Sequence, residues 1–318
     1  MAEPLHTRAM IGVAFAPVKG PIDMVGLLLR KLISYHRKYR LYLLVGLAIT
    51  VVGGAVETSA RPLSVRVDRW LEMRNFSGTV EFLQNGRWNR AQRGQRLSNI
   101  GDGVRTGPGS LARLAVDTQI GFVSVSENTD LRITDLYTTP RGGKVTQLDV
   151  QRGQARIFVR PFTNPDSRLE IRTPAGVNGV RGTDFGIITQ PGGRSALVVE
   201  EGRVTSSAQG ESVSVDAGFQ NIIIPGEPPS LPEPLSDDAT FKIFRVERRN
   251  RQSGRSRTNV LLKGNTSPYN LLLIDDETQE TDRDGNFDVL LPLPETELFN
   301  VKIITPLGTE KIYELVVP

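Results

Sequence analysis

The stretch LARLAVDTQIGFVSVSENTDLRI, residues 111–133, decides the fold class. Its apolar residues recur at every second position, and in an extended chain such residues share one face. The matching pairs are Leu114 with Val116, Val123 with Val125, and Leu131 with Ile133. A period of two is typical of half-buried β-strands, so this stretch predicts consecutive strands packed on one core.

The same pattern extends along the chain in both directions from this stretch. Turn residues interrupt it about every ten positions, as at Gly107-Pro108-Gly109, Asn164-Pro165-Asp166 and Gly192-Gly193. No long stripe with helical spacing appears after Leu63. We therefore expect an all-β chain that folds as a roll, a sandwich or a short solenoid, and not an α/β enzyme fold.

The N-terminal part has a different composition. A basic cluster (Arg30, Lys31, Arg37, Lys38 and Arg40) precedes an apolar run at 41–56. Basic flanks stay on the cytoplasmic side, so we expect the rest of the chain to be exported to the periplasm. The run spans only about 24 Å as a helix, which leaves open an inner-membrane anchor or a signal peptide cleaved near 58–60. Met10 and Met24 are alternative starts.

Charge and composition exclude several function classes for the exported body. Residues 1–40 hold seven basic and two acidic residues, whereas 32 of each sign follow from Arg61 onward, so the body is formally neutral and we expect no nucleic-acid partner. Both histidines, His6 and His36, precede the apolar run, and the chain has no cysteine. We expect no cofactor, no metal site, no small-molecule substrate and no enzyme activity, because the body lacks His and Cys for triads and metal sites.

A proline-rich stretch at 225–239 predicts an extended, semi-rigid linker, because proline cannot donate a ladder hydrogen bond. Seven strand-like runs follow, at 241–248, 258–264, 269–275, 277–281, 286–291, 298–305 and 310–317. We assign a tail and membrane segment to 1–60, a β domain to 61–224, and a small sandwich of the immunoglobulin-like kind to 240–318. This last part resembles the immunoglobulin-like domains of bacterial envelope proteins, which implies a spacer or adhesion module.

Three short elements within the β domain carry a family resemblance. They are Gly101-Asp102 with Arg105 and Thr106, Thr173-Pro174 with Val180-Arg181-Gly182-Thr183-Asp184-Phe185, and Glu201-Gly202 with Val204. In this order and spacing, residues 86–225 resemble the FecR domain, an extracytoplasmic β domain of bacterial iron-dicitrate sensor regulators. Residues 124–129 look like the cyanobacterial versions. The resemblance implies a β fold that contacts another protein and makes these residues the candidate interaction site.

The chain departs from the full sensor in one respect. In that family an anti-sigma domain precedes the membrane helix, but a tail of at most 40 residues is too short for a packed domain. From the residues themselves, we expect the glycines to form corners, and Arg181 to pair with Asp184 or Asp102 across adjacent coils. Corner chemistry without a ligand is the simpler interpretation of this cluster.

Two cues in the terminal domain have alternative interpretations. Residues 282–288 look like the start of a calcium loop, but Leu293 stands where a bidentate Glu would be needed, so a hairpin turn is favoured. Six arginines lie between Arg245 and Arg257 (245, 248, 249, 251, 255 and 257). They predict either a grip on an anionic surface or, preferably, a solvated hairpin that keeps an edge strand from pairing.

We therefore predict a non-enzymatic scaffold of the cell envelope that displays a β surface to another envelope protein or a cell-wall component. One alternative is a signal transducer related to FecR-type sigma-factor regulators of iron transport. Another is an enzyme acting on wall polysaccharide, for which Asp102 with Asp184 is the carboxylate pair to consider.

Overall fold

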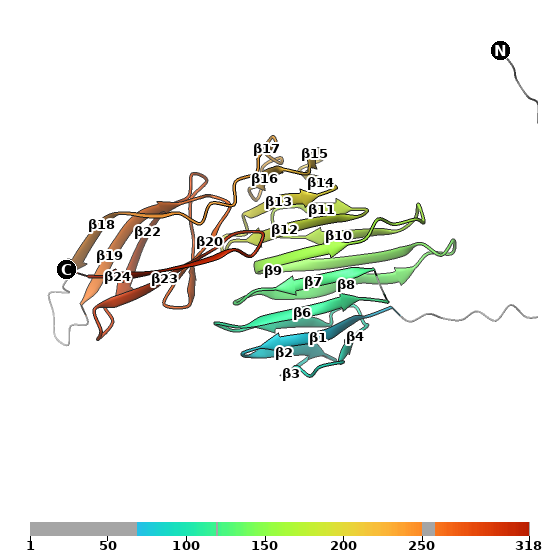
Figure 1. Cartoon of the computed structure of the whole chain (residues 1–318), viewed down its shortest axis with the longest axis horizontal. Helices are drawn as coiled ribbons and strands as arrows, with labels where there is room; N and C mark the ends of the chain where they lie inside the picture. The colour runs from blue at the N-terminus through green and yellow to red at the C-terminus, as the bar shows by residue number, and fades with distance from the viewer. Residues whose placement is uncertain (1–68, 119, 250–257, 318) are drawn as a thin grey trace, which may run out of the picture. The chain divides into compact units, whose positions relative to one another are not determined.

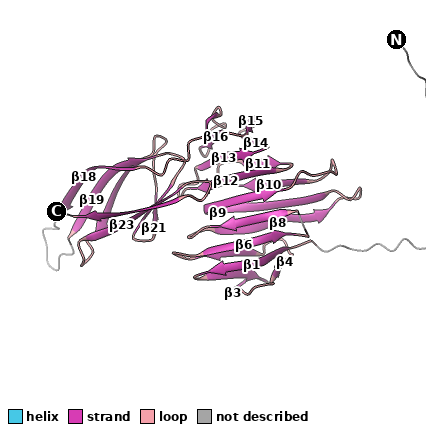
Figure 2. Cartoon of the chain, viewed as in Figure 1, coloured by secondary structure: helices cyan, strands magenta, loops and turns pink. Residues whose placement is uncertain are grey.

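The computed structural model describes residues 69–118, 120–249 and 258–317, and all of them belong to one compact unit. Every regular element in these ranges is a β-strand (Figure 2). The all-β prediction is confirmed. The predicted membrane segment at 41–56 lies outside the described residues. Within the described ranges, no helix is long and apolar enough to span a membrane.

The first seventeen strands form a roll of two sheets (Figure 1). Sheet A has the order β4-β1-β6-β7-β9-β12-β13-β16-β17, and sheet B has the order β3-β2-β5-β8-β9-β10-β11-β14-β15. The strand bounds are β1 Leu71–Ser77, β2 Val80–Gln84, β3 Arg87–Arg90, β4 Arg96–Leu97, β5 Gly103–Thr106, β6 Leu111–Val116, β7 Gly121–Val125, β8 Asp130–Thr138, β9 Lys144–Val159, β10 Arg168–Arg172, β11 Val177–Val180, β12 Thr183–Thr189, β13 Ser195–Glu201, β14 Arg203–Ala208, β15 Glu211–Asp216, β16 Phe219–Ile223 and β17 Glu233–Pro234.

The chain alternates between the two sheets. It forms a hairpin in one sheet, crosses a corner, and forms the next hairpin in the other sheet, as in β12-β13 and then β14-β15. Strand β9 belongs to both sheets: residues up to Arg152 pair with β8, and residues from Gly153 pair with β12. Gly153 has φ 93°, and a Cβ there would lie 2.6 Å from the Cα of Thr129, so glycine permits the crossing.

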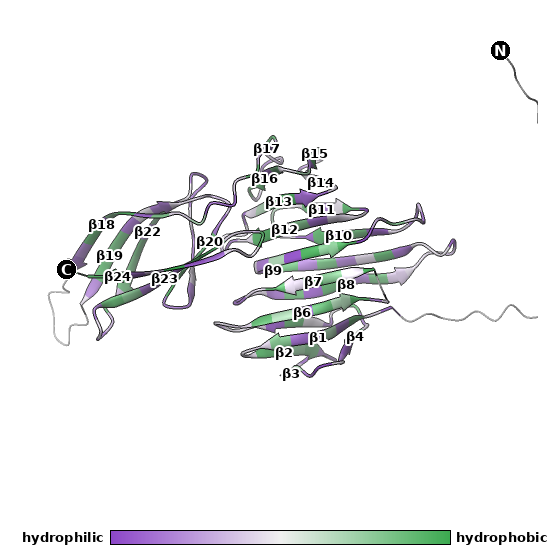
Figure 3. Cartoon of the chain, viewed as in Figure 1, coloured by the Kyte–Doolittle hydropathy of each residue, from purple (hydrophilic) through white to green (hydrophobic). Residues whose placement is uncertain are grey.

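The roll core lies between the sheets and follows the period of two. The apolar pairs of residues 111–133 are at most 1% exposed, and all belong to one cluster. Figure 3 shows the alternation as green and purple segments along single strands. Alternate positions face solvent or polar neighbours, which is why the pattern could be recognised in the sequence.

The last seven strands form two further sheets, β18-β19-β22 and β21-β20-β23-β24. Their bounds are β18 Phe241–Arg249, β19 Asn259–Thr266, β20 Leu271–Ile274, β21 Glu277–Gln279, β22 Asn286–Pro292, β23 Leu298–Ile304 and β24 Glu310–Val316. Each lies within or overlaps one predicted run. The two sheets share a core that includes Leu262, Phe287 and Val301, so this part is a sandwich. Its immunoglobulin-like character stays a prediction.

The sandwich packs on the outer face of sheet A. Ile188 and Val198 of the roll form one buried cluster with Leu271 and Leu273 of the sandwich. At Gly186, on the same face, a Cβ would overlap the carbonyl of Pro306. The absence of a side chain at 186 therefore lets two backbones approach each other closely.

Two residues of the proline-rich segment form ladder pairs, although its prolines were expected to deny them. Glu233 and Pro234 pair with Gln220 and Phe219 as the edge strand β17. Proline is tolerated at an edge because its missing N–H is not needed by a further strand. Part of the segment thus continues sheet A.

The turn at Asp282 also differs from the predicted hairpin. Strands β21 and β22, which flank it, lie in different sheets, so the turn is a crossover between sheets. The Asp282 carboxylate accepts hydrogen bonds from the backbone N–H of Asp284 at 2.9 Å and of Asn286 at 2.8 Å. The Asp282 side chain therefore stabilises the turn by itself, although the flanking strands β21 and β22 do not pair with each other.

The arginine run begins on β18, which is an edge strand and forms a hairpin with β19. Arg245 and Arg249 form ion pairs with Glu247, and Arg248 pairs with Glu297. The positions from 250 to 257 lie outside the described residues. The described part places exposed cations along an edge strand, as the preferred interpretation expects.

Candidate functional site

The predicted interaction residues 180–185 and 201–204 form two adjacent corners of the roll. Gly182 has φ 147° and Gly202 has φ 82°. A Cβ at 202 would lie 2.5 Å from the carbonyl oxygen of Gly182, so the corners stack backbone on backbone. The next corner joins them, because the N–H of Ala217 donates to the carbonyl oxygen of Gly202 at 3.0 Å. The glycines are thus needed for stacking.

The first predicted element forms a corner of its own between β4 and β5. The buried Asp102 carboxylate accepts backbone N–H bonds from Ser98 and Asn99, both at 3.0 Å. Gly101 has φ 90°, and its N–H donates to the carbonyl oxygen of Ile133 at 2.8 Å. Asp102 therefore caps its own turn and is not available to a partner.

Arg105 and Thr106 of this element make contacts within the roll. The Arg105 guanidinium lies 4.1 Å from the ring centroid of Trp88 and pairs with Asp130 at 3.1 Å. The Thr106 hydroxyl donates to the carbonyl oxygen of Ser126 at 2.5 Å. Both side chains link neighbouring strands.

The expected pairing of Arg181 with Asp184 or Asp102 is wrong. The Arg181 guanidinium donates instead to the carbonyl oxygen of Pro165. Asp184 binds Arg156, through Nε at 3.0 Å and Nη2 at 2.9 Å. Because Arg181 and Asp184 lie on opposite sides of the Gly182 corner, their side chains serve different sheets: β11 is in sheet B and β12 is in sheet A.

Arg156 is the centre of a charged cluster that the sequence did not suggest. Besides Asp184, its guanidinium pairs with Glu200, and its Nη1 donates to the carbonyl oxygen of Leu307 in the sandwich at 3.3 Å. The pairing register shifts between Asp184 and Phe185, which places Glu200 at a bulge. The hydrogen bond with Asp184 raises the pKa of Arg156, so the cluster holds a permanent cation.

The remaining predicted residues have structural places. Val180, Phe185 and Val204 lie in the roll core. The Thr173 hydroxyl is 3.3 Å from the hydroxyl of Ser195, and Pro174 adjoins Gly193. Thr183 is buried, and its hydroxyl has no hydrogen-bond partner among the described residues. Glu201 is exposed and stands opposite Asp184 in the register. These residues thus stabilise the corners of the roll, and Glu201 is the exposed acidic side chain among them.

Polar residues at the roll–sandwich contact were also missed. Glu127, 3% exposed at its side chain, pairs with Lys302 of the sandwich. The Gln154 amide donates to the carbonyl oxygen of Pro306 at 2.7 Å, and the Gln190 amide to that of Asn270 at 2.6 Å. The signal was present: residues 196–199 and 271–274 are continuous apolar runs, which indicate strands buried on both faces.

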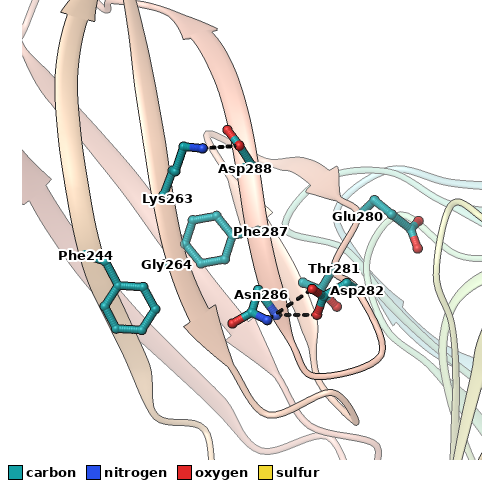
Figure 4. A pocket seen from close by; sticks show the side chains of 9 residues that line it. All are labelled: Phe244, Lys263, Gly264, Glu280, Thr281, Asp282, Asn286, Phe287 and Asp288. Atoms are coloured by element: carbon teal, nitrogen blue, oxygen red, sulfur yellow. Dashed lines mark hydrogen bonds and ion pairs between the residues drawn. The ribbon is translucent and has the colours of Figure 1, made fainter.

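A pocket of about 680 Å³ lies in the sandwich (Figure 4). Phe244, Gly264 and Phe287 line it together with Asp282 and Asn286, which are hydrogen-bonded to each other. None of the predicted interaction residues lines this pocket. No group of three or more His, Cys, Asp or Glu side chains suited to a metal ion is found within the described ranges.

The comparison with protein families agrees with the resemblance over part of the chain. The family described as FecR protein matches residues 102–205, inside the predicted stretch. Two crystal structures of a candidate anti-sigma factor from Parabacteroides distasonis, at 1.65 Å and 2.50 Å resolution, are similar at 16% identity and a TM-score of 0.36. Each similarity covers 42% of this chain and 59% of that one, so the chain matches less than two thirds of their length. The search of curated proteins found no match. The match to the FecR family therefore covers about a third of the chain.

Proposed function

We propose that the chain is a signal transducer of the FecR type, which acts by binding proteins and not by catalysis. The FecR match at residues 102–205 is the single observation that carries this proposal. In this proposal residues 41–56 anchor the chain in the inner membrane, the body lies in the periplasm, and the basic tail meets a cytoplasmic partner. Iron transport would be the process sensed, as the family resemblance implies.

The arrangement of the body supports a transmitting role. The sandwich is held to the FecR domain by a buried apolar cluster and by the Glu127–Lys302 pair. A partner that binds the sandwich would therefore displace the FecR domain with it, because a buried apolar contact joins the two. In this proposal, the signal ends as a change in how the basic tail, residues 1–40, binds its cytoplasmic partner.

The test uses the full chain in its native membrane. A variant that lacks residues 1–28 keeps the basic flank and the apolar run. It should lose the transcription that depends on the partner sigma factor, while the amount of the body stays normal. Chemical cross-linking of the full chain should capture an RNA polymerase sigma factor, and the shortened variant should not. A mature protein that begins at Arg61 would refute the transducer, because no tail would remain.

A second candidate is the scaffold predicted from the sequence, in which the body holds an envelope protein or a cell-wall component in place. The close approach of the Gly186 backbone to that of Pro306 favours it, because this contact holds the roll and the sandwich together as one surface for a partner. The scaffold predicts that envelope proteins are captured equally by the full chain and by the variant lacking residues 1–28, with no change in transcription. These two results separate the candidates.

A further inference from the structure

Strand β15 (Glu211–Asp216) is the outermost strand of sheet B, at the end of the stack beyond β14 (Figure 1). It pairs with β14 on one side, from Arg203 opposite Asp216 to Ala208 opposite Glu211. Among the described residues, the recorded strand pairing of β15 is with β14. A free edge presents unpaired N–H and C=O groups, which are a template for another strand.

The other long edges in the described part of the chain carry protective features. Strand β18 has a register shift between Ile243 and Arg245. Strand β22 ends at Pro292. On β24, the exposed Lys311 places a charge within the strand, 5.1 Å from the ring centroid of Tyr313. Bulges, prolines and lysines on an edge strand all discourage strand addition.

Strand β15 has no bulge, proline or lysine, and its charges stand at its two ends. Val215 is fully buried in the roll core, whereas Val213, on the same face, is only partly buried against that core. Ser212 and Ser214 point to the exposed face. At the corresponding end of sheet A, β17 covers β16. The core is therefore open beside Val213 and covered on the opposite sheet.

We propose that β15 pairs antiparallel with β15 of a second copy, about a twofold axis at Ser214. In this register Val213 lies opposite Val215 of the second copy, and each Ser214 lies opposite the other. Ser212 lies opposite Asp216, and Glu211 lies opposite Ala217, so no like charges face each other. Such an interface is isologous, and the two valine pairs extend the roll core across it. The dimer goes beyond the proposed function and does not depend on it.

Cross-linking tests the register directly, because the chain has no cysteine. Opposite residues of antiparallel strands have Cα atoms about 4.5 to 5.5 Å apart, within the range a disulfide bridges. Full-length Ser214→Cys, expressed in cells, should form a disulfide-linked dimer under a mild oxidant. The matched control is Ile312→Cys, on an edge that is also exposed but carries Lys311, and it should stay monomeric.

Solution mass gives an independent readout. The purified full chain should have about twice the mass of one chain, and Ile312→Lys should match it. Ser214→Lys places two lysines opposite each other without touching the core, so it should reduce the mass to that of one chain. A monomeric wild type, equal cross-linking at 214 and 312, or cross-linking of Ser214→Cys to a protein of different mass would each overturn the proposal. None of these results bears on the transcriptional test.

Discussion

Strands β12 and β13 are covered on both faces, whereas the next hairpin, β14 and β15, is covered on one. In the first hairpin Ile187 faces the roll core and Ile188 faces the sandwich. In the second, Val204 faces the core, but Thr205 is exposed. Both hairpins alternate inward and outward side chains along each strand. They differ in what packs on their outer faces. Outward residues that are apolar mark where the chain folds back on itself.

Removing a buried charge partner is expected to have the largest effect on the covered side. Lys302→Met leaves the Glu127 carboxylate without its cation, and should lower the free energy of unfolding by about 3 to 5 kcal/mol. Chemical denaturation of the wild type and variant measures this loss. The exposed pair Lys263 with Asp288 is the control, since Lys263→Met should cost less than about 1 kcal/mol. Equal losses would mean that the roll–sandwich contact is not buried.

Adding one methyl group tests the two outer faces with matched changes. Gly186→Ala forces the Pro306 backbone away, and should cost about 1 to 3 kcal/mol. Gly179→Ala, on the outer face of sheet B, meets nothing within 4 Å and should change stability by less than about 0.5 kcal/mol. Denaturant titration measures both, and protease cleavage within 225–239 should increase only for Gly186→Ala. Similar behaviour of the two variants would contradict the contrast.

The inner face of sheet B contains a buried polar group without a hydrogen-bond partner among the described residues. Asn178 on β11 is fully buried, and neither its amide nitrogen nor its oxygen has a hydrogen-bond partner among the described residues. Asn178→Leu should therefore raise the free energy of unfolding by about 1 kcal/mol. The control Asn221→Leu removes bonds to Ser206 and Ser230 and should destabilise. Thermal unfolding of both variants checks the sign, and destabilisation by Asn178→Leu would refute the prediction.

The smallest effect should appear at the sandwich turn that meets Arg194. Burial alone would raise the pKa of Asp282, but hydrogen bonds from Asn286 and Asp284 outweigh it, and the pKa is lowered. A lowered pKa stabilises the fold above the unfolded value of about 3.9 and loses this effect as pH falls through the folded value. The stability difference between wild type and Asp282→Asn should thus be larger at pH 7 than at pH 2. Denaturation at both values measures it, and a difference that grows in acid would be the wrong sign.

Local chemistry made the strands predictable from the sequence. The period of two placed the core residues, and the glycines at 182 and 202 marked corners because few other residues adopt their backbone angles. The side-chain partners were not predictable, since Arg156 and Asp184 are 28 positions apart and meet only through the strand register. The hairpin expected at Asp282 failed for the same reason, because a turn motif does not specify which sheet its flanking strands join.

The packing of the sandwich on sheet A was predictable from two apolar runs that break the alternation of apolar and polar residues. Four consecutive apolar residues at 196–199, and four more at 271–274, leave no polar face in either strand. Each run therefore requires cover on two sides, and each covers the other. The proline-rich segment predicted a domain boundary with a semi-rigid linker, and composition describes the stiffness of such a segment but not the surfaces it brings together.

Strand β9 has a mechanical consequence for the roll. Its 16 residues run through both sheets without a break in the chain, so the sheets are joined by covalent bonds as well as by side-chain packing. A load applied to one sheet reaches the other through this backbone, and peeling them apart would require bending the strand at Gly153. The roll should therefore transmit force between its two sheets along the backbone of one strand.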